Sequence, residues 1–276
     1  MEAGTELDGR YILEERLGSG GMGDLWRGTD RELRREVAVK LMRFAVPELA
    51  RRFEREAEIA AKLQHPGITV VYDRGWHADQ PFIVMELLLG QDLARLVEEN
   101  QAGLAVDYAV QLTIQAAEAL QAAHNHHVVH RDLKPANLFL QQNGMLKICD
   151  FGIARAADMT TSLTSTGTVI GTPLYMAPEQ WQGEQADERS DLYSLGCVLY
   201  ELLTGQPPFL GDLQSKVMFK HLYVLPDSPR ESGGRIFPHN LISSSWICSL
   251  RIPPVGRPAP PTSWRYSRGS RSPLRE

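Results

Sequence analysis

The chain has 276 residues, of which 43% are apolar and 23% charged, values typical of a soluble globular protein with room for a sizeable core. No apolar run approaches the roughly 18 residues of a membrane-spanning helix, and the N-terminus lacks the basic and apolar regions of a signal peptide. The three cysteines, Cys149, Cys197 and Cys248, are odd in number and far apart. They argue against a disulfide framework and favour a reducing, cytoplasmic location.

The net charge of −5 is unevenly distributed along the chain. Residues 223–276 contain eight Arg, no Lys and three acidic residues, a net charge of +5, whereas the other 222 residues have a net charge of −10. The same segment holds nine of the 17 prolines. Because this Pro-, Ser- and Arg-rich tail shows no helical stripe, we predict that residues 223–276 are disordered.

The region 11–87 is predicted to form a small lobe of strands with one helix, preceded by an N-terminal extension over residues 1–10. Pro47 suits the first turn of a helix that continues to Lys62. A helix interposed among antiparallel strands indicates an α+β arrangement. The strands are expected at Tyr11–Leu17, Asp24–Thr29, Glu36–Met42, Thr69–Tyr72 and Phe82–Leu87.

Beyond Gly90 the pattern becomes mainly helical. One predicted helix, Ser190–Thr204, is closed by Gly205 and followed by prolines. Another, Val106–His124, is expected to bury the side chains of Val106, Val110, Ile114, Ala117 and Leu120. Residues 128–180 lie between these helices with little periodicity, and loops of that length are usually functional.

A glycine cluster, Gly18-Ser19-Gly20-Gly21-Met22-Gly23, follows the first predicted strand. The same spacing occurs in dinucleotide-binding folds, where it opens a helix, but here a second strand follows. The context therefore favours a glycine-rich hairpin that covers phosphates, with an ordinary flexible hairpin as the alternative.

Lys40 lies inside the apolar strand segment Val37-Ala38-Val39-Lys40. A lysine with apolar neighbours needs either an anionic partner or a solvated face, so an exposed edge-strand lysine is the alternative. Three carboxylates of the following predicted helix are candidate partners: Glu54, Glu56 and Glu58.

The most specific motif is His130-Arg131-Asp132-Leu133-Lys134-Pro135-Ala136-Asn137, which is followed by Asp150-Phe151-Gly152 and Ala177-Pro178-Glu179. With the glycine cluster and Lys40, this set resembles the protein-kinase signature, and the chain resembles bacterial, eukaryotic-like (Hanks-type) serine/threonine protein kinases. The resemblance covers residues 11–221. It implies a bilobal α+β fold with a small β-rich N-lobe at 11–87 and a larger, mainly helical C-lobe at 88–222, incomplete at its C-terminal end.

The resemblance also implies a role for each motif residue in phosphoryl transfer. Asp132 would orient the substrate hydroxyl and accept its proton, and Lys134 would place a positive charge beside the transferred group. Asn137 and Asp150 would bind Mg²⁺ or Mn²⁺ through oxygen. Lys40 would hold the ATP phosphates, and the family spacing selects Glu56 as its partner.

The nucleotide base would lie between apolar side chains, and Met85-Glu86-Leu87 would form a hinge whose backbone hydrogen-bonds adenine. Cys149 would lie at the inner end of this pocket. For Leu17, Leu25 and Ala38, core packing is equally compatible with the sequence. The nucleotide-binding residues implied are Leu17, Gly18, Ser19, Gly20, Gly21, Met22, Gly23, Asp24, Leu25, Ala38, Lys40, Met85, Glu86 and Phe139.

The family pattern also predicts serine/threonine specificity and regulation. Lys134 in the catalytic loop and Thr172 are typical of serine/threonine kinases. Arg131 would bind phosphate on the activation loop, where Thr164 and Thr166 match positions that bacterial relatives autophosphorylate. The alternative is that this segment is only a solvated Ser/Thr-rich loop.

The pattern fails near Tyr223. Asp191 is expected to bond the catalytic-loop backbone, but Glu179 has no recognisable arginine partner, and Arg257 matches only by its Arg-Pro dipeptide. A shifted reading frame after Tyr223 would explain the loss of the later helices, and a natural low-complexity tail is the alternative. His124, His126 and His127 are expected to form a helix end rather than a metal site.

The sequence therefore predicts an ATP-dependent protein serine/threonine kinase that autophosphorylates its activation loop. The alternative is a truncated, weak or inactive remnant that binds nucleotide or partner kinases. Expected partners are Ser/Thr-containing protein substrates and a second copy for phosphorylation in trans. We expect no nucleic-acid partner and no membrane segment in this chain.

Overall fold

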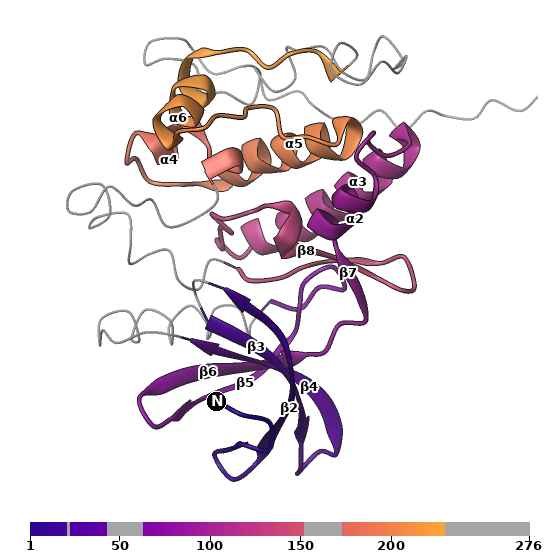
Figure 1. Ribbon diagram of the computed structural model, residues 1–276, viewed down its shortest axis with the longest axis vertical. Coiled ribbons are helices and arrows are strands. Elements are labelled where there is room, and N and C mark those ends of the chain that lie inside the picture. The colour runs from indigo at the N-terminus through magenta and orange to yellow at the C-terminus, as the bar shows by residue number, and fades with distance from the viewer. Residues whose placement is uncertain (21–22, 43–62, 152–172, 230–276) are drawn as a thin grey trace, which may run out of the picture.

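A computed structural model describes residues 1–20, 23–42, 63–151 and 173–229, which form two lobes stacked along the long axis of the molecule (Figure 1). The N-lobe is a six-stranded antiparallel sheet in the order β1-β2-β3-β4-β6-β5. The strands are β1 (Glu6–Leu7), β2 (Tyr11–Gly20), β3 (Gly23–Asp30), β4 (Arg35–Met42), β5 (Val71–His77) and β6 (Gln80–Glu86).

The N-lobe sheet buries apolar side chains on both faces, because successive residues of a strand point to opposite sides. Along β4, Val37, Val39 and Leu41 belong to one core cluster with Tyr11 and Phe82. On the other face Ala38 and Met42 pack with Ile83 and Met85, and Leu25 and Leu87 lie against this second cluster. The second face is the one that carries residues expected to contact nucleotide.

Two N-lobe boundaries differ from the sequence-based expectation. Residues 1–10 are not a separate extension, because β1 pairs with β2 and Leu7 is fully buried in the sheet core. β5 begins at Val71 and continues to His77, beyond the predicted Thr69–Tyr72. Since β5 is an edge strand, its outer side chains are polar or exposed, and the apolar run that marks an interior strand is absent.

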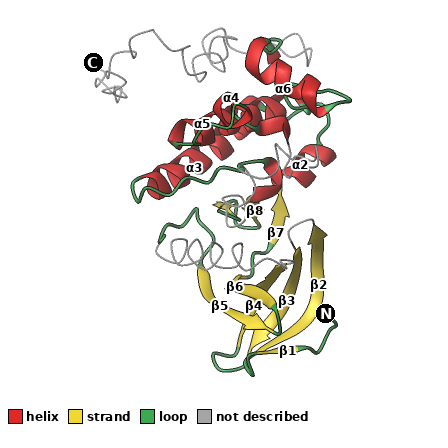
Figure 2. Ribbon diagram, turned by 90° about the vertical axis from the view of Figure 1, so that its left-hand side faces the viewer, coloured by secondary structure: helices red, strands yellow, loops and turns green. Residues whose placement is uncertain are grey.

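The C-lobe begins with the three-stranded sheet β7-β8-β9, which lies between the N-lobe and the helices (Figure 2). None of the described helices is long and apolar enough to span a membrane. The elements are β7 (Gly90–Asp92), α2 (Leu93–Glu99), α3 (Val106–His124), η1 (Pro135–Asn137), β8 (Leu138–Gln141), β9 (Leu146–Ile148), η3 (Pro173–Tyr175), α4 (Pro178–Trp181), α5 (Glu188–Thr204) and α6 (Gln214–Tyr223).

Helix α3 has the predicted bounds, and its predicted buried stripe is confirmed in part. Ile114, expected in the core, is 49% exposed. The buried side chains are Ala109, Leu112, Ala116, Ala119, Leu120, Ala123 and His124. The four alanines on this face let α3 pack closely against α5 and β9. Of the predicted stripe, Leu120 is fully buried, and Val106 and Ala117 pack against the core.

Helix α5 is the central element of the C-lobe and is buried around most of its circumference. The Asp187 side chain caps its first turn by accepting from the Arg189 backbone N–H, so it begins two residues before the predicted Ser190. Gly205 ends it at a φ of 80°, where an added Cβ would lie 2.0 Å from the Gln101 carbonyl oxygen. Only glycine satisfies both requirements.

The packed structure continues past residue 222, the predicted end of the C-lobe. Helix α6 ends at Tyr223, and the segment after it returns toward α5 with Pro226 and Pro229 buried. Residues 223–229 are therefore part of the folded lobe. The rest of the predicted tail, with Arg257 and the proposed frame shift, lies outside the described residues.

A buried carboxyl of α5 makes the stability of this lobe depend on pH. Burial raises the pKa of Glu201 above its ordinary 4.5, although the hydrogen bond from Tyr175 Oη, 2.6 Å away, opposes the rise. The folded chain therefore binds this proton more tightly than the unfolded chain. The resulting stabilisation is complete below pH 4.5 and is lost as the pH rises through the folded pKa.

We therefore predict that Glu201→Gln flattens the pH dependence of the melting temperature between about pH 5 and 8. The amide oxygen can still accept from Tyr175, so the variant should melt about 2–4 °C higher than wild type at the alkaline end. Tyr175→Phe is the matched variant, and it should steepen the pH dependence because it removes the opposing hydrogen bond. Parallel wild-type and Glu201→Gln curves would contradict the assignment.

Candidate active site

The catalytic-loop motif, residues 130–137, connects α3 to β8 and is anchored by hydrogen bonds to Asp191 of α5. Asp191 is fully buried and accepts from the backbone N–H groups of His130 at 2.8 Å and Arg131 at 2.7 Å. Nε2 of His124, in the last turn of α3, lies 2.7 Å from the same carboxylate. The expected contact of Asp191 with the loop backbone is present, and His124 reinforces it.

Within this loop, Asp132 is held by two neighbours. Lys134 Nζ donates to Asp132 Oδ2 at 2.9 Å, and the amide nitrogen of Asn137 donates to the Asp132 carbonyl at 2.8 Å. The second hydrogen bond fixes the rotamer of Asn137, whose nitrogen is engaged, so its side-chain oxygen is the atom available to a cation. Three motif residues thus form one preorganised unit.

His130 joins this unit to the segment that carries Asp150. Its Nε2 lies 2.9 Å from the Cys149 carbonyl, and its ring is 4.9 Å from that of Phe151. The Cys149 N–H also donates to the Asn137 carbonyl at 2.8 Å. The two sequence motifs are therefore brought side by side by main-chain contacts rather than by loop proximity alone.

The carboxylate of Asp150 forms an ion pair across the two lobes with Lys40 of β4. Lys40 Nζ lies 2.6 Å from Asp150 Oδ1, and the Lys40 side chain is 15% exposed. Burial by itself would raise the pKa of Asp150, but the charge and hydrogen bond of Lys40 outweigh it and lower that pKa below its usual value. Asp150 is therefore ionised at neutral pH, as a metal ligand must be.

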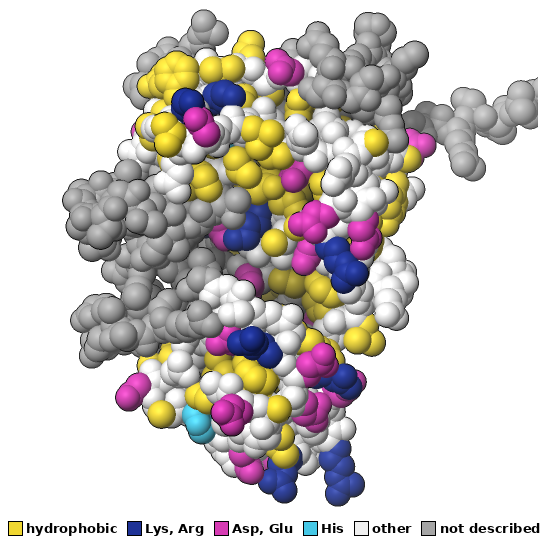
Figure 3. Space-filling view, in the orientation of Figure 1, with side chains coloured by type: hydrophobic (Ala, Val, Ile, Leu, Met, Phe, Trp, Pro, Cys, Tyr) yellow, Lys and Arg dark blue, Asp and Glu magenta, His cyan; other side chains and the backbone are white. Residues whose placement is uncertain are grey.

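Glu56, the expected partner of Lys40, lies outside the described residues, as do Gly21 and Met22 of the glycine cluster. The same holds for the regulatory positions Thr164, Thr166 and Thr172. The contact that Lys40 makes in the described chain is the one with Asp150. On the face shown in Figure 3, basic and acidic side chains lie beside one another where the lobes meet.

The donor set fits a hard divalent cation. The side-chain oxygens of Asn137 and Asp150 are the kind of ligand that Mg²⁺ prefers, and the Cys149–Asn137 main-chain bond holds the two residues together. A cation held by these two oxygens would take its remaining ligands from phosphate oxygens and water. Neither thiol nor imidazole ligands are needed.

The expected base-binding residues lie on both sides of the boundary between the lobes. Ala38, Leu25 and Met85 share a cluster on the cleft-facing side of the N-lobe sheet, and Phe139 of β8 is half-buried on the C-lobe side. Leu17 is 46% exposed near the end of β2. Gly18, Ser19 and Gly20 pair with Leu25, Asp24 and Gly23, which forms the predicted glycine hairpin.

The thiol of Cys149, the residue before Asp150, contacts the segment that precedes β5. Its Sγ is 3.1 Å from Thr69 Oγ1. Burial raises the pKa of this thiol to about 12, even though Thr69 opposes the rise. Cys149 is therefore a neutral packing group next to Asp150 rather than a nucleophile.

Two contacts that the sequence did not predict support the site. Gln180 of α4 donates to the Arg131 carbonyl at 2.9 Å, and Arg131 itself has a φ of 66°. Lys147 of β9 forms an ion pair with Glu86 at 2.6 Å. Lys147 had a sequence signal, a lysine between Leu146 and Ile148 like the one that marked Lys40, whereas Gln180 had none.

Glu179, which lacks a recognisable arginine in the sequence, is buried in α4. It accepts a short hydrogen bond from the Ser190 hydroxyl of α5. The adjoining η3 segment is also held by α5, since Ser194 Oγ donates to the Tyr175 carbonyl at 2.7 Å. Helix α5 thus supports both the catalytic loop and the segment that follows the activation loop.

Comparison with known proteins agrees with this geometry, because the protein kinase domain model matches residues 11–234. The chain belongs to the protein kinase family. Serine/threonine-protein kinase PknB of Mycolicibacterium smegmatis is 44% identical over 246 residues, which are 86% of this kinase chain and 39% of that protein. PknB of Mycobacterium tuberculosis is 43% identical over 244 residues, 84% of this chain and 39% of the relative.

A probable serine/threonine-protein kinase of Streptomyces coelicolor is 45% identical over 237 residues, which are 83% of this chain and 35% of that protein. The kinase chain thus spans between 35% and 39% of the length of these three relatives. Family members use ATP with a divalent metal ion to phosphorylate proteins.

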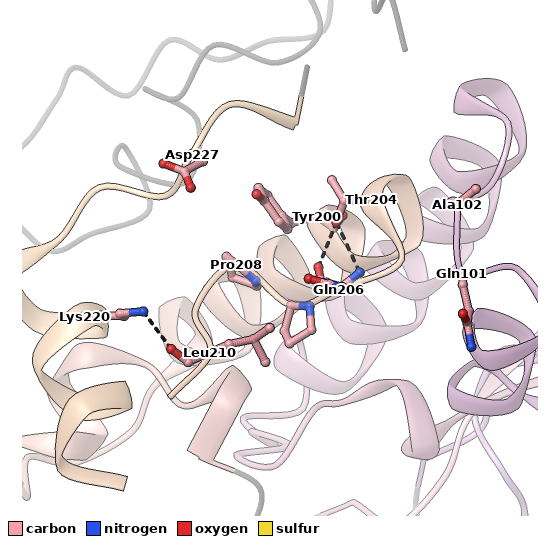
Figure 4. Close-up of a pocket in the computed structure, with 10 residues that line it drawn as sticks. Gln101, Ala102, Tyr200, Thr204, Gln206, Pro208, Leu210, Lys220 and Asp227 are labelled. Carbon is pink, nitrogen blue, oxygen red and sulfur yellow. Dashed lines mark hydrogen bonds between the residues drawn. The ribbon is translucent and has the colours of Figure 1, made fainter. Parts of the chain in front are cut away.

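A hollow of 440 Å³ lies in the kinase C-lobe away from the catalytic loop (Figure 4). Tyr200 and Thr204 of α5, the prolines that follow it and Asp227 line the opening. Lys220 borders it and donates to the Leu210 carbonyl at 2.7 Å. None of the predicted site residues lines this hollow, so it is separate from the active site.

We predict that Asp191→Ala lowers both kinase stability and any phosphoryl-transfer activity. The change leaves the buried N–H groups of His130 and Arg131 without this acceptor, at a cost of about 1–3 kcal/mol each. Activity should fall at least about tenfold, measured with melting temperature on the same preparation. Asp191→Asn should also be impaired, since its NH₂ would face one of the donors.

Leu192→Ala is the matched control, because Leu192 is the next residue of α5 and its side chain is 38% exposed. It should change stability by no more than about 0.5 kcal/mol. If Asp191→Ala behaved like this control, Asp191 would not be the anchor of the loop.

Proposed function

We propose that this chain is an ATP-dependent protein serine/threonine kinase that transfers the γ-phosphate to Ser and Thr hydroxyls. The observation that carries the proposal is the 2.6 Å ion pair between Lys40 and Asp150. This ion pair joins a cation of the N-lobe to the C-lobe carboxylate that we propose as a metal ligand, and the Asp132–Lys134–Asn137 unit lies close to that carboxylate in the fold. Phosphoryl transfer requires mainly this kind of positioning and charge neutralisation.

Each described residue has a physical task in that reaction. Asp132, oriented by Lys134, would accept a hydrogen bond from the substrate hydroxyl and take its proton as the oxygen attacks. Lys134 would neutralise charge on the transferred group, and Lys40 would hold the other phosphates. The glycine hairpin would let backbone N–H groups approach the phosphates without side-chain obstruction.

Asn137 and Asp150 would hold the metal ion, for which we propose Mg²⁺ or Mn²⁺ because both accept oxygen ligands. When bound, the ion would neutralise phosphate charge and orient the γ-phosphate. The hinge backbone from Met85 to Leu87, together with Leu17, Leu25, Ala38 and Phe139, would hold the adenine. Glu56, on the helix expected from Pro47 to Lys62, would form an ion pair with Lys40 and hold it in position.

The physiological acceptors would be Ser- or Thr-bearing proteins, and a second copy of the chain would be one of them. The requirement for ATP favours a cytoplasmic location. A nucleotide-binding but inactive remnant is the second candidate. It is favoured by Glu179, a buried carboxylate whose expected arginine has no recognisable match in the sequence.

Labelling with [γ-³²P]ATP distinguishes these two functions. Purified protein with Mg²⁺ should incorporate label into Ser or Thr, on itself or on a protein acceptor. Asp132→Asn and Lys40→Met should each lower incorporation at least about 100-fold, because Asp132 would act on the acceptor hydroxyl and Lys40 would hold the other phosphates of ATP in place.

A thermal melt of the same preparations provides the control. A nucleotide that binds the folded chain raises its melting temperature. A higher melting temperature with Mg-ATP but no incorporated label would therefore favour the second candidate, the inactive nucleotide-binding remnant. Asp132→Asn should retain the rise, since this carboxylate acts on the acceptor rather than on the nucleotide.

We further propose that Thr164 and Thr166 are autophosphorylated and that their phosphates pair with Arg131. The double change Thr164→Ala/Thr166→Ala should lower activity at least several-fold, because the activation loop loses its charge-assisted contact. Thr160→Ala/Thr161→Ala is the matched control and should have little effect. Equal turnover of both double variants would reject the assignment, and phosphopeptide mapping of wild type identifies the modified positions.

A further inference from the structure

The Lys147–Glu86 ion pair joins the two lobes at the back of the hinge. Lys147 belongs to β9 of the C-lobe and Glu86 is the last residue of β6 in the N-lobe. Their side chains are 9% and 18% exposed, and Lys147 Nζ lies 2.6 Å from Glu86 Oε1. A largely desolvated pair of this kind has a single well-defined geometry, because either charge left alone would be strongly unfavourable.

The residues 67–70 complete the same junction. The Val70 N–H donates to Glu86 Oε1 at 2.7 Å, and the Glu86 N–H donates to the Val70 carbonyl at 3.0 Å. Lys147 Nζ also donates to the Ile68 carbonyl at 3.3 Å. We call Lys147, Glu86 and these main-chain groups the hinge clasp. It gives the Glu86 carboxylate two fixed partners, Lys147 Nζ and the Val70 N–H.

The hinge clasp is connected to both ends of the nucleotide site. At the base end, Glu86 follows Met85, which pairs with Ala38 in the N-lobe sheet, and Lys147 pairs across the strands with Phe139. At the phosphate end, Asp150 follows Lys147 by three residues and contacts Lys40. A change in the clasp would therefore move the hinge backbone relative to the metal-binding carboxylate.

We propose that Lys147 is a positioning residue that holds the hinge backbone in register with the phosphate site and thereby sets the preference for adenine. This proposal rests on the proposed function in one respect, namely that the hinge backbone binds the base. Hydrogen bonds to a base edge depend on alignment within a few tenths of an ångström. Contacts to the phosphates through Lys40 and a metal ion are electrostatic and tolerate such a shift.

The experiment measures binding of Mg-ADP and Mg-GDP to the full chain by titration calorimetry, which does not require phosphoryl transfer. Wild type should prefer ADP. Lys147→Met should weaken ADP binding about three- to tenfold, the value of one well-aligned hydrogen bond. GDP binding should change less than about twofold, because it depends on the phosphates and the metal. A residue with only a general structural role would weaken both nucleotides together.

Lys147→Met also leaves the Glu86 carboxylate without its counter-charge, so a second variant separates this effect. Lys147→Met/Glu86→Gln removes both charges and should recover much of the lost melting temperature. It should nevertheless keep the lowered ADP preference, because the tie between the lobes is still missing. Lys216→Met is the matched control, since Lys216 forms an exposed 2.6 Å pair with Asp212, and it should leave both affinities unchanged.

An ADP preference that stays within about twofold of wild type in both clasp variants would overturn the proposal. Recovery of the preference in the double variant would overturn it as well, since the charge imbalance would then be the cause. The proposal is also overturned if the wild-type chain binds ADP and GDP equally well, because there is then no preference for the hinge clasp to determine. By contrast, a wild type that binds and prefers ADP but transfers no phosphate contradicts the proposed function alone.

Discussion

One buried carboxylate determines where the catalytic loop lies. Asp191 is enclosed by α3 and α5, and its two hydrogen bonds from the backbone of His130 and Arg131 offset the left-handed φ of 66° at Arg131. A non-glycine residue in that region costs about 1–3 kcal/mol. From this anchor the contacts continue outward, through Gln180 to the Arg131 carbonyl and through His130 to the segment with Asp150.

The two lobes are joined by more than the hinge strand. Leu63 and Ile68 precede β5 in sequence but pack in the C-lobe core, and Ile68 forms a parallel bridge with Ile148 of β9. The Lys40–Asp150 and Glu86–Lys147 ion pairs add two polar contacts across the same boundary, one beside the catalytic loop and one at the hinge. Apolar packing holds the two lobes together. The ion pairs fix the orientation of one lobe relative to the other, because a buried ion pair is favourable only over a small range of distances and angles.

Sequence motifs predicted the family, the bilobal fold and which residues converge, because these depend on short patterns with a fixed chemical meaning. The bounds of α3 were also predictable, but its buried face was predictable only in part. Leu120 is in the core as expected, whereas the buried alanines were not selected and Ile114 points outward. β1 and the outer half of β5 lacked a local signal, since edge strands need no apolar alternation. Pairings such as Gln180 with Arg131 depend on tertiary contacts that no single segment encodes.

The neutral thiol of Cys149 has a chemical consequence. Burial raises the pKa of the Cys149 thiol to about 12, so the thiolate form is scarce at neutral pH. Electrophiles and peroxides react with the thiolate form. The side chain next to Asp150 is therefore expected to react slowly with alkylating agents and peroxides, although it adjoins a charged carboxylate.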